Sequence, residues 1–218
     1  MAGQITLDTE FGRKLKELAE DPKYQVFVEV GAWNGQGSTL CLAEGLRGRK
    51  DGAQLISFEA NKNWWRVAAA FWKGQEGAPV RVLWGRLAER MMTESEIVEN
   101  ALYDTIKDHF NLHFKQDVED FASAPLVHMR RCDVAILDGG EFSGYYDWKA
   151  IEPLAPRVVC LDDIRVMKNS KVLVDLMSKN WSVVWMTTER NGAAILVPPP
   201  EPERGLETVA EAPAEETA

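Results

Sequence analysis

Short apolar runs alternate with helical patterns along most of the chain. The apolar runs predict strands, and between them lie stretches whose apolar residues recur at the spacing of a helix. The predicted parallel strands cover 26–30, 54–59, 80–84, 132–138 and 157–163. The predicted helices cover 8–20, 37–46, 62–73, 143–152 and 168–179. Single helices between short strands are typical of βαβ units and therefore of a parallel sheet.

The final apolar segment has a different pattern. WSVVWMTTERNGAAILVP (181–198) indicates two strands joined at ERNG, and Asn-Gly is a strong signal for a hairpin turn. Five parallel strands and this hairpin give seven strands. We therefore expect an α/β fold, with a Rossmann-like, seven-stranded, mostly parallel sheet, helices on both faces and a C-terminal antiparallel hairpin strand.

Two segments fall outside this alternation. Residues 85–131 are too long for a simple crossover and contain helical patterns, so we interpret them as a helical insertion over the C-terminal edge of the sheet. A lid and plain packing on the sheet edge are equally consistent with it. His109 and His113 have no third ligand at a suitable spacing, which favours an ordinary helix face. Pro198–Ala218 is rich in proline and glutamate, which predicts a disordered acidic tail after one domain over 1–197.

Composition narrows the class of protein. A length of 218 residues fits one domain, and the net charge of −9 argues against nucleic acid or an anionic membrane as the main partner. No apolar run is long enough to span a bilayer, and the N-terminal residues lack the hydrophobic region of a signal peptide. Cys41, Cys132 and Cys160 have no metal-ligand spacing, so we expect free thiols in the cytoplasm. The sequence leaves open whether the chain forms a homodimer.

The stretch EVGAWNGQGS, Glu29–Ser38, joins the first long strand to the next helix. Its glycines fall as G-x-x-x-G-x-G, which differs from the dinucleotide fingerprint. Gly31 and Gly35 let a ligand approach the main chain, and the helix N-terminus offers free N–H groups. An acid at position 29, and no lysine of a phosphate-binding loop, favour a cationic or hydroxyl-rich ligand. Glu59, at the end of the next strand, is placed to accept hydrogen bonds from a ribose diol.

EVGAWNGQGST resembles the first motif of class I S-adenosylmethionine-dependent methyltransferases, in the form with an aromatic residue in place of the middle glycine. The acid at position 59 and the terminal hairpin match that family too. The resemblance covers about residues 8–197 and leaves 85–131 unmatched. It implies S-adenosylmethionine as the cofactor. The implied cofactor-binding positions are Glu29, Gly31, Trp33, Gly35, Ser38, Glu59, Gly85 and Arg86.

The resemblance also implies what several of these positions do. Glu29 would hold the region of the cofactor's amino-acid end, and Ser38 would bond its carboxylate. Glu59 would bind the ribose, while Gly85 and Arg86 would lie near the adenine.

Acids also end the fourth and fifth predicted strands, at Asp138 and at Asp162-Asp163. Adjacent parallel strands lie about 4.8 Å apart, so these carboxylates can converge on one hard cation. Metal-dependent O-methyltransferases of the catechol type resemble this arrangement. The resemblance implies a divalent ion, Mg²⁺ or Mn²⁺, that binds substrate oxygens and lowers the pKa of the attacking hydroxyl.

Three residues after Asp138 the sequence departs from the catechol pattern, with Glu141 in place of a lysine or histidine base. Glu141 could be a base or a helix-start acid, and His128 is a second candidate base. LDGGEFSGYYDWKAIEPL (137–154) resembles methyltransferase-like domains linked to glycan synthesis, which implies O-methylation of a small-molecule or glycan hydroxyl. Two alternatives stay open: a metal-independent enzyme using Glu141 or His128, and a non-catalytic interaction module.

Overall fold

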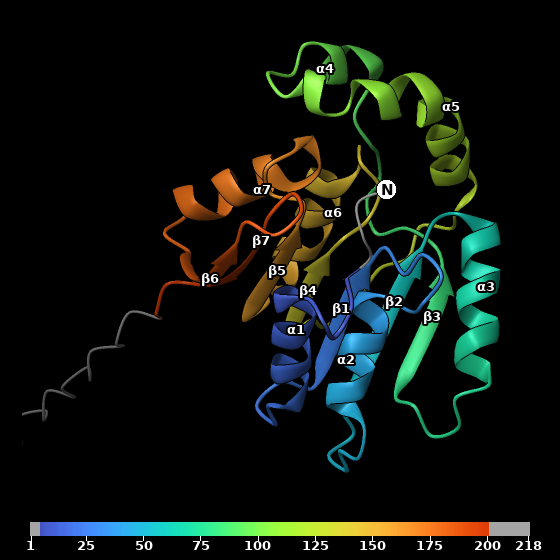
Figure 1. Ribbon diagram of the computed structural model, residues 1–218, viewed down its shortest axis with the longest axis vertical. Coiled ribbons are helices and arrows are strands. Elements are labelled where there is room, and N and C mark those ends of the chain that lie inside the picture. Colours follow the sequence, from blue (N-terminus) through green and yellow to red (C-terminus); the bar gives the residue numbers. More distant parts are fainter. Residues whose placement is uncertain (1–4, 201–218) are drawn as a thin grey trace, which may run out of the picture.

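The structure, a computed structural model, describes residues 5–200 as strands and helices in layers (Figure 1). The strands are β1 (Val26–Val30), β2 (Gln54–Glu59), β3 (Val80–Trp84), β4 (Val134–Leu137), β5 (Val158–Asp162), β6 (Ser182–Thr187) and β7 (Ala193–Val197). The helices are α1 (Glu10–Glu20), α2 (Ser38–Leu46), α3 (Lys62–Lys73), α4 (Glu94–Val98), α5 (Lys107–Ser123), α6 (Gly144–Ile151) and α7 (Met167–Ser178). From residue 201 onward, the predicted acidic tail lies outside the described residues.

The strands form one seven-stranded sheet in the order β3-β2-β1-β4-β5-β7-β6. Strands β1 to β5 are parallel, and β7 pairs antiparallel with both β5 and β6. The predicted fold class is therefore confirmed, including the C-terminal hairpin. The strand order reverses between β1 and β4, and open α/β sheets bind ligands beyond the carboxyl ends of strands at such a point.

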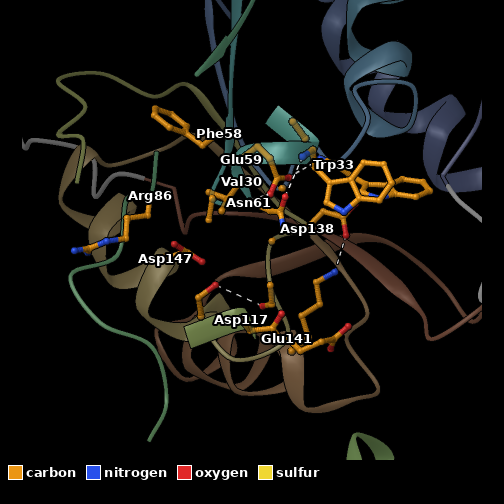
Figure 2. Close-up of a pocket in the computed structure, with 18 of the residues that line it drawn as sticks. Val30, Trp33, Phe58, Glu59, Asn61, Arg86, Asp117, Asp138, Glu141 and Asp147 are labelled. Carbon is orange, nitrogen blue, oxygen red and sulfur yellow. Dashed lines mark hydrogen bonds and ion pairs between the residues drawn. The ribbon is translucent and has the colours of Figure 1, made fainter. Parts of the chain in front are cut away.

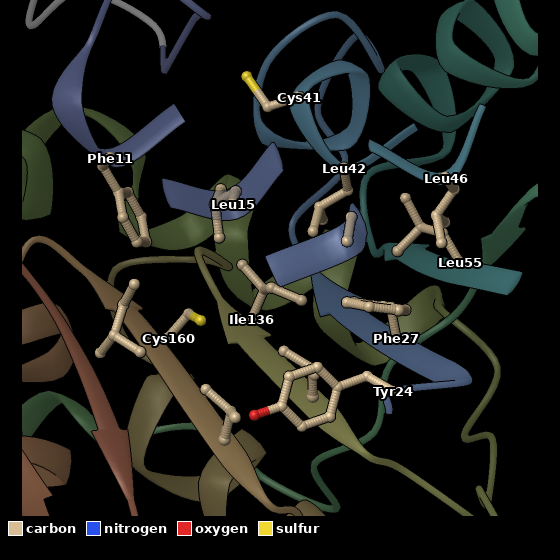
Figure 3. Close-up of a cluster of buried hydrophobic side chains, with 14 of the residues drawn as sticks. Phe11, Leu15, Tyr24, Phe27, Cys41, Leu42, Leu46, Leu55, Ile136 and Cys160 are labelled. Carbon is tan, nitrogen blue, oxygen red and sulfur yellow. The ribbon is translucent and has the colours of Figure 1, made fainter. Parts of the chain in front are cut away.

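One face of the sheet packs against α1 and α2 (Figure 3). Phe27 of β1 and Ile136 of β4 are fully buried there with Leu15 of α1 and Leu42 of α2. The three cysteines are buried free thiols, two of them in this layer. Burial of each large apolar side chain stabilises the fold by about 1.5–3 kcal/mol.

The opposite face packs against α6 and α7. Val28 and Leu137 come directly after Phe27 and Ile136 in the chain. Successive strand residues point to opposite sides of a sheet, so these two side chains lie on the second face. They pack in one buried cluster with Trp148 of α6 and with Val172 and Leu176 of α7. Both faces are covered, which explains why the central strands are continuous apolar runs.

Residues 85–131 hold α4 and α5, which lie beyond the carboxyl ends of the strands (Figure 1). The two ends of the segment lie side by side at the sheet edge, because Arg86 pairs with Leu126 in an isolated parallel bridge. A small apolar cluster docks it on the sheet edge, where Ile97 and Ile106 pack with Phe142 and others. Within residues 5–200, no helix is long and apolar enough to cross a membrane.

The first testable prediction concerns the close contact between α1 and α2. A Cβ atom at Gly45 would stand 2.3 Å from the carbonyl oxygen of Lys16 and 2.6 Å from the Cβ of Ala19. Gly45→Ala should therefore lower the free energy of unfolding by about 1–3 kcal/mol, because the helices must move apart. Urea denaturation measures the change.

Gly74→Ala is the matched control. Gly74 ends α3 with φ −80°, and an added Cβ would meet only one backbone oxygen at 3.4 Å. This control should change the free energy of unfolding by less than about 0.5 kcal/mol. Equal effects of the two substitutions would contradict the assignment of a tight α1–α2 contact.

Candidate functional site

A cavity of about 530 Å³ lies at the carboxyl edge of the sheet (Figure 2). Residues at the end of each of the five parallel strands line it, namely Gly31, Glu59, Gly85, Asp138 and Asp163. The insertion closes one side of the cavity with residues of α5. Asp117, Asp120 and Phe121 are the α5 residues in its wall. The volume is within the range of about 300–1,000 Å³ that is typical of small-molecule sites.

The structure brings most of the predicted site residues into this cavity. The predicted cofactor positions that line it are Gly31, Trp33, Ser38, Glu59, Gly85 and Arg86. The predicted metal and base positions that line it are Asp138, Glu141 and Asp163. Glu29, Gly35, Asp162 and His128 are not among the lining residues, each for a different physical reason.

Glu29 lies beneath the cavity wall, fully buried inside β1. One carboxylate oxygen accepts hydrogen bonds from the Thr39 hydroxyl, at 2.7 Å, and from the Ser57 hydroxyl. The other oxygen has no hydrogen-bond partner among the described residues. Burial raises the pKa of Glu29 to about 7. Glu29 therefore ties the start of α2 and strand β2 to strand β1.

Gly35 packs against α3, and its predicted part in binding the cofactor stays a prediction. Its φ is +77°, and an added Cβ would stand 2.7 Å from Nε1 of Trp72. That Nε1–H donates to the Gly35 carbonyl oxygen at 2.9 Å. Gly31 does line the cavity, with φ +96° and space for a Cβ blocked by the Asp138 carbonyl oxygen at 2.2 Å.

His128 lies outside the cavity. Leu126 pairs with Arg86 at the carboxyl edge, and from there the chain runs back to the start of β4 at the opposite edge. His128 is on this return path with an exposed side chain. Nothing in its position connects it to the groups that line the cavity, so Glu141 is the base candidate that the structure brings into the site.

Glu59 and Trp33 form the wall at the end of β2 (Figure 2). The two Glu59 oxygens accept backbone N–H bonds from Trp33 at 2.7 Å and from Asn61 at 2.8 Å. Burial raises the pKa of Glu59 to about 7. Each oxygen keeps a lone pair for a further donor. The Trp33 ring lies 5.2 Å from that of Trp64, and both rings are partly exposed beside the cavity.

Arg86 and Asp147 lie on another side of the cavity. The Arg86 side chain donates to the carbonyl oxygens of Ala88 and Glu89 and lies over the Phe121 ring. Asp147 of α6 was missed by the sequence reasoning. It is 2% exposed, and its Oδ2 has no hydrogen-bond partner among the described residues. Burial raises the pKa of Asp147 to about 7. An acid within the apolar stretch YYDWKAI was the only sequence signal for it.

Asp138, Asp162 and Asp163 come together as their positions on neighbouring strands predict. One carboxylate oxygen of each lies within 4.8 Å of the others. Asp162 is held beneath the cavity wall by Arg190 of the turn between β6 and β7, whose guanidinium donates to its Oδ2 at 3.2 Å. Burial first, and then the Asp138 charge, raise the pKa of Asp162 to about 7.

Lys168 lies between the other two carboxylates and had no counterpart in the sequence prediction. Its Nζ donates to Asp138 Oδ1 at 2.7 Å and to Asp163 Oδ2 at 3.1 Å. Asp163 also accepts from the Asn191 amide at 3.0 Å. Burial works to raise the pKa of Asp163, yet the Lys168 charge and hydrogen bond hold it below its ordinary value. A divalent ion does not fit this cluster while the ammonium stays there.

Glu141 completes the acidic side of the cavity. Its Oε2 is buried without a hydrogen-bond partner among the described residues. Burial raises the pKa of Glu141, and the Lys168 charge opposes this only in part. On α5 above it, His109 Nε2 lies 2.9 Å from Asp117 Oδ2, so this histidine pairs within the insertion. Of the carboxylates around Lys168, Glu141 is therefore the one with an oxygen free to accept a proton.

No known protein-family model matches the sequence, and no curated protein sequence matches it. Solved structures of similar fold do exist. A putative caffeoyl-CoA O-methyltransferase from Staphylococcus aureus has a TM-score of 0.57 at 13% identity, over 89% of this chain and 85% of that one. An O-methyltransferase from Bacillus cereus in complex with S-adenosylhomocysteine (SAH) has a TM-score of 0.55 at 14% identity. The match covers 90% of this chain and 84% of that one.

The SAH-bound methyltransferase PaMTH1 from Podospora anserina has a TM-score of 0.52 at 16% identity, over 85% of this chain and 76% of that one. The chain therefore has the Rossmann-like fold of S-adenosylmethionine-dependent methyltransferases. This agrees with the family that its glycine motif and Glu59 resemble.

The second testable prediction concerns Glu29. Its pKa in the folded protein is about 7, above its ordinary value of 4.5, so the folded protein binds more protons between these values. The free energy of unfolding then falls as the pH rises from about 4.5 to about 7. In Glu29→Gln the free energy of unfolding should fall less over this pH range than in wild type, by up to about 3 kcal/mol. Chemical denaturation at a series of pH values measures it.

Glu119→Gln serves as the control, because Glu119 is exposed on α5. This variant should follow the wild-type pH dependence throughout. If the Glu29→Gln curve also runs parallel to wild type, the carboxylate does not bind the extra proton on folding.

Proposed function

We propose that this chain transfers a methyl group from S-adenosylmethionine to a hydroxyl oxygen of a small-molecule or glycan acceptor. The observation that carries the proposal is one cavity holding Glu59 at one wall and Glu141 beside Lys168 at another. The first wall suits a ribose and the second suits a hydroxyl that must lose a proton. The SAH-bound structures of similar fold support the choice of cofactor.

The cofactor half of the proposal rests on groups that can accept or donate a further hydrogen bond. Glu59 offers lone pairs to a ribose diol, and its two backbone hydrogen bonds fix the carboxylate in place. The N-terminus of α2 has no side-chain cap at Gly37, so it and Ser38 suit a carboxylate. The buried free oxygen of Asp147 suits an amino group such as that of adenine. When bound, the sulfonium supplies an electrophilic methyl group.

The acceptor half is supported by Glu141. The free Oε2 of Glu141 accepts the hydroxyl proton, because its raised pKa makes it a stronger base than an exposed carboxylate. This carboxylate also orients the acceptor so that its oxygen faces the methyl group.

The metal-assisted form predicted from the sequence has one observation for it and one against it. Three carboxylates converge at Asp138, Asp162 and Asp163, which favours Mg²⁺ or Mn²⁺. Lys168 and Arg190 already neutralise them, which disfavours a second cation. We therefore propose methyl transfer without assigning a metal ion a part in it.

Other predictions stay open. Closure of the insertion as a lid gains support from the α5 residues in the cavity wall. Activity in the cytoplasm gains support from the free cysteines. A non-catalytic interaction module remains the alternative function, and binding without turnover would favour it.

The third testable prediction concerns the cofactor. SAH should bind the purified protein with micromolar affinity, measured by titration calorimetry. Glu59→Ala should weaken binding by about 1–3 kcal/mol, because charge-assisted hydrogen bonds to the ribose are lost. Glu119→Ala, on the exposed face of α5, should bind as wild type does. The proposed function fails if folded wild-type protein binds neither SAH nor S-adenosylmethionine.

The fourth testable prediction concerns the base. Glu141→Gln should lower the rate of methyl transfer by about 10²-fold and leave SAH affinity unchanged, because only the proton acceptor is removed. The wild-type rate should rise with pH through the raised pKa of Glu141, since the ionised carboxylate is the active form. A radiolabelled methyl donor with a panel of sugars and catechols measures this. An unchanged rate and pH profile in the variant would exclude Glu141 as the base.

A further inference from the structure

The acidic cluster at the ends of β4 and β5 contains its own cation. Lys168, in the first turn of α7, has a side chain that is only 6% exposed. Its ammonium bonds Asp138 and Asp163, the two acids of the cluster that line the cavity. A divalent ion bridging those carboxylates would need the same space.

We propose that the Lys168 ammonium takes the place of a divalent metal ion in this cluster and hydrogen-bonds the acceptor oxygen during transfer. The first half of this inference stands on the geometry of the cluster alone. The second half rests on the proposed function.

The position of Lys168 is fixed by its neighbour in the chain. Asn169 is fully buried, and its Nδ2 donates to the Leu137 carbonyl oxygen at 2.9 Å and to the Asp162 carbonyl oxygen at 2.8 Å. These bonds tie the first turn of α7 to the ends of β4 and β5 together. Gly144 allows α6 to pack against the same turn, since an added Cβ would lie 2.4 Å from the Lys168 carbonyl oxygen. The lysine is therefore held at the junction of two strands and two helices.

Charge balance also opposes a metal ion. Asp138, Asp163 and Glu141 face Lys168 from the loops after β4 and β5. Burial works to lower the pKa of Lys168, but these acids outweigh it and keep the ammonium charged. A divalent ion would have to expel this buried cation, leaving it without its partners, or lie beside it against strong repulsion.

The geometry leaves one donor for the reaction. An ammonium has three N–H donors, and those of Lys168 have two acceptors among the described residues. Lys168 lines the cavity together with Glu141. As the acceptor oxygen bonds the methyl carbon, its proton passes to the Glu141 carboxylate. The electron pair of the broken S–CH₃ bond stays on sulfur. The third N–H stabilises the negative charge that develops on the oxygen.

The test is a direct measurement of metal binding, with Mn²⁺ as the probe and its free signal followed by electron paramagnetic resonance. Wild-type protein should show no stoichiometric Mn²⁺ site. Lys168→Met should gain a site with at least about tenfold tighter binding, because Asp138 and Asp163 lose their cation. Adding Asp138→Asn to that variant should remove the site again. Lys171→Met, which removes an exposed lysine of the same helix over the Tyr145 ring, should behave as wild type.

Two results would overturn the inference. One is a stoichiometric Mn²⁺ site in wild type that Asp138→Asn abolishes, since Lys168 would then not hold that place. The other is a folded Lys168→Met variant that gains no site. Should Lys168→Met fail to fold, the wild-type titration decides alone.

Methyl transfer tests the second half of the inference. Wild-type activity should persist in EDTA, and Lys168→Met should lose about 10²-fold in rate with SAH affinity unchanged, as expected for a lost oxyanion donor. A Lys168→Met rate equal to that of Lys171→Met would remove Lys168 from the reaction. These outcomes are separate from a failure of the proposed function, which would appear as no SAH binding or no transfer by wild type while the metal titration still gave its own answer.

Discussion

The ion pairs of Lys168 with Asp138 and Asp163 allow four carboxylates to lie at one buried edge of the sheet. Burying several like charges together costs several kcal/mol unless cations and hydrogen bonds compensate for the lost water. Lys168 supplies that compensation at the centre, and Arg190 supplies it for Asp162 at the side. Glu141 is the acid left without a hydrogen bond to its buried oxygen. The uncompensated acid is thus the one best placed to take a proton.

The cavity therefore has two electrostatic halves, and the strand order separates them. Glu59 ends β2 on one side of the point where the sheet order reverses, and Asp138 follows β4 on the other. Gly31 lies between them and brings the loops after β1 and β4 into contact, because its missing Cβ leaves room for the Asp138 carbonyl oxygen. A side chain at this position would push the two halves apart. One glycine thus lets the Glu59 wall and the acidic wall lie close together.

The sequence predicted those parts of the fold that depend on residues close together in the chain. Apolar runs marked all seven strands, Asn-Gly marked the hairpin, and an acid at a strand end marked Glu59. Lys168 could not be predicted in the same way. A lysine in the first turn of a helix is ordinarily solvated, and only the convergence of two distant strand ends above it makes this one buried. The contact of Gly35 with Trp72 could not be predicted for a similar reason, since Trp72 lies on α3, beyond the next strand of the chain.

The insertion contacts both halves of the cavity. On the cofactor side, Asp120 of α5 accepts a hydrogen bond from Asn61, the residue that caps α3 just after Glu59. On the acidic side, Phe142 packs among insertion residues and directly follows Glu141 in the chain. A movement of α5 away from the sheet would break the first contact and expose the second. Water would then reach Glu141, and the burial that raises its pKa would be lost. The packing of Phe142 against the insertion therefore both holds α5 on the sheet and keeps the pKa of Glu141, the proposed proton acceptor, raised.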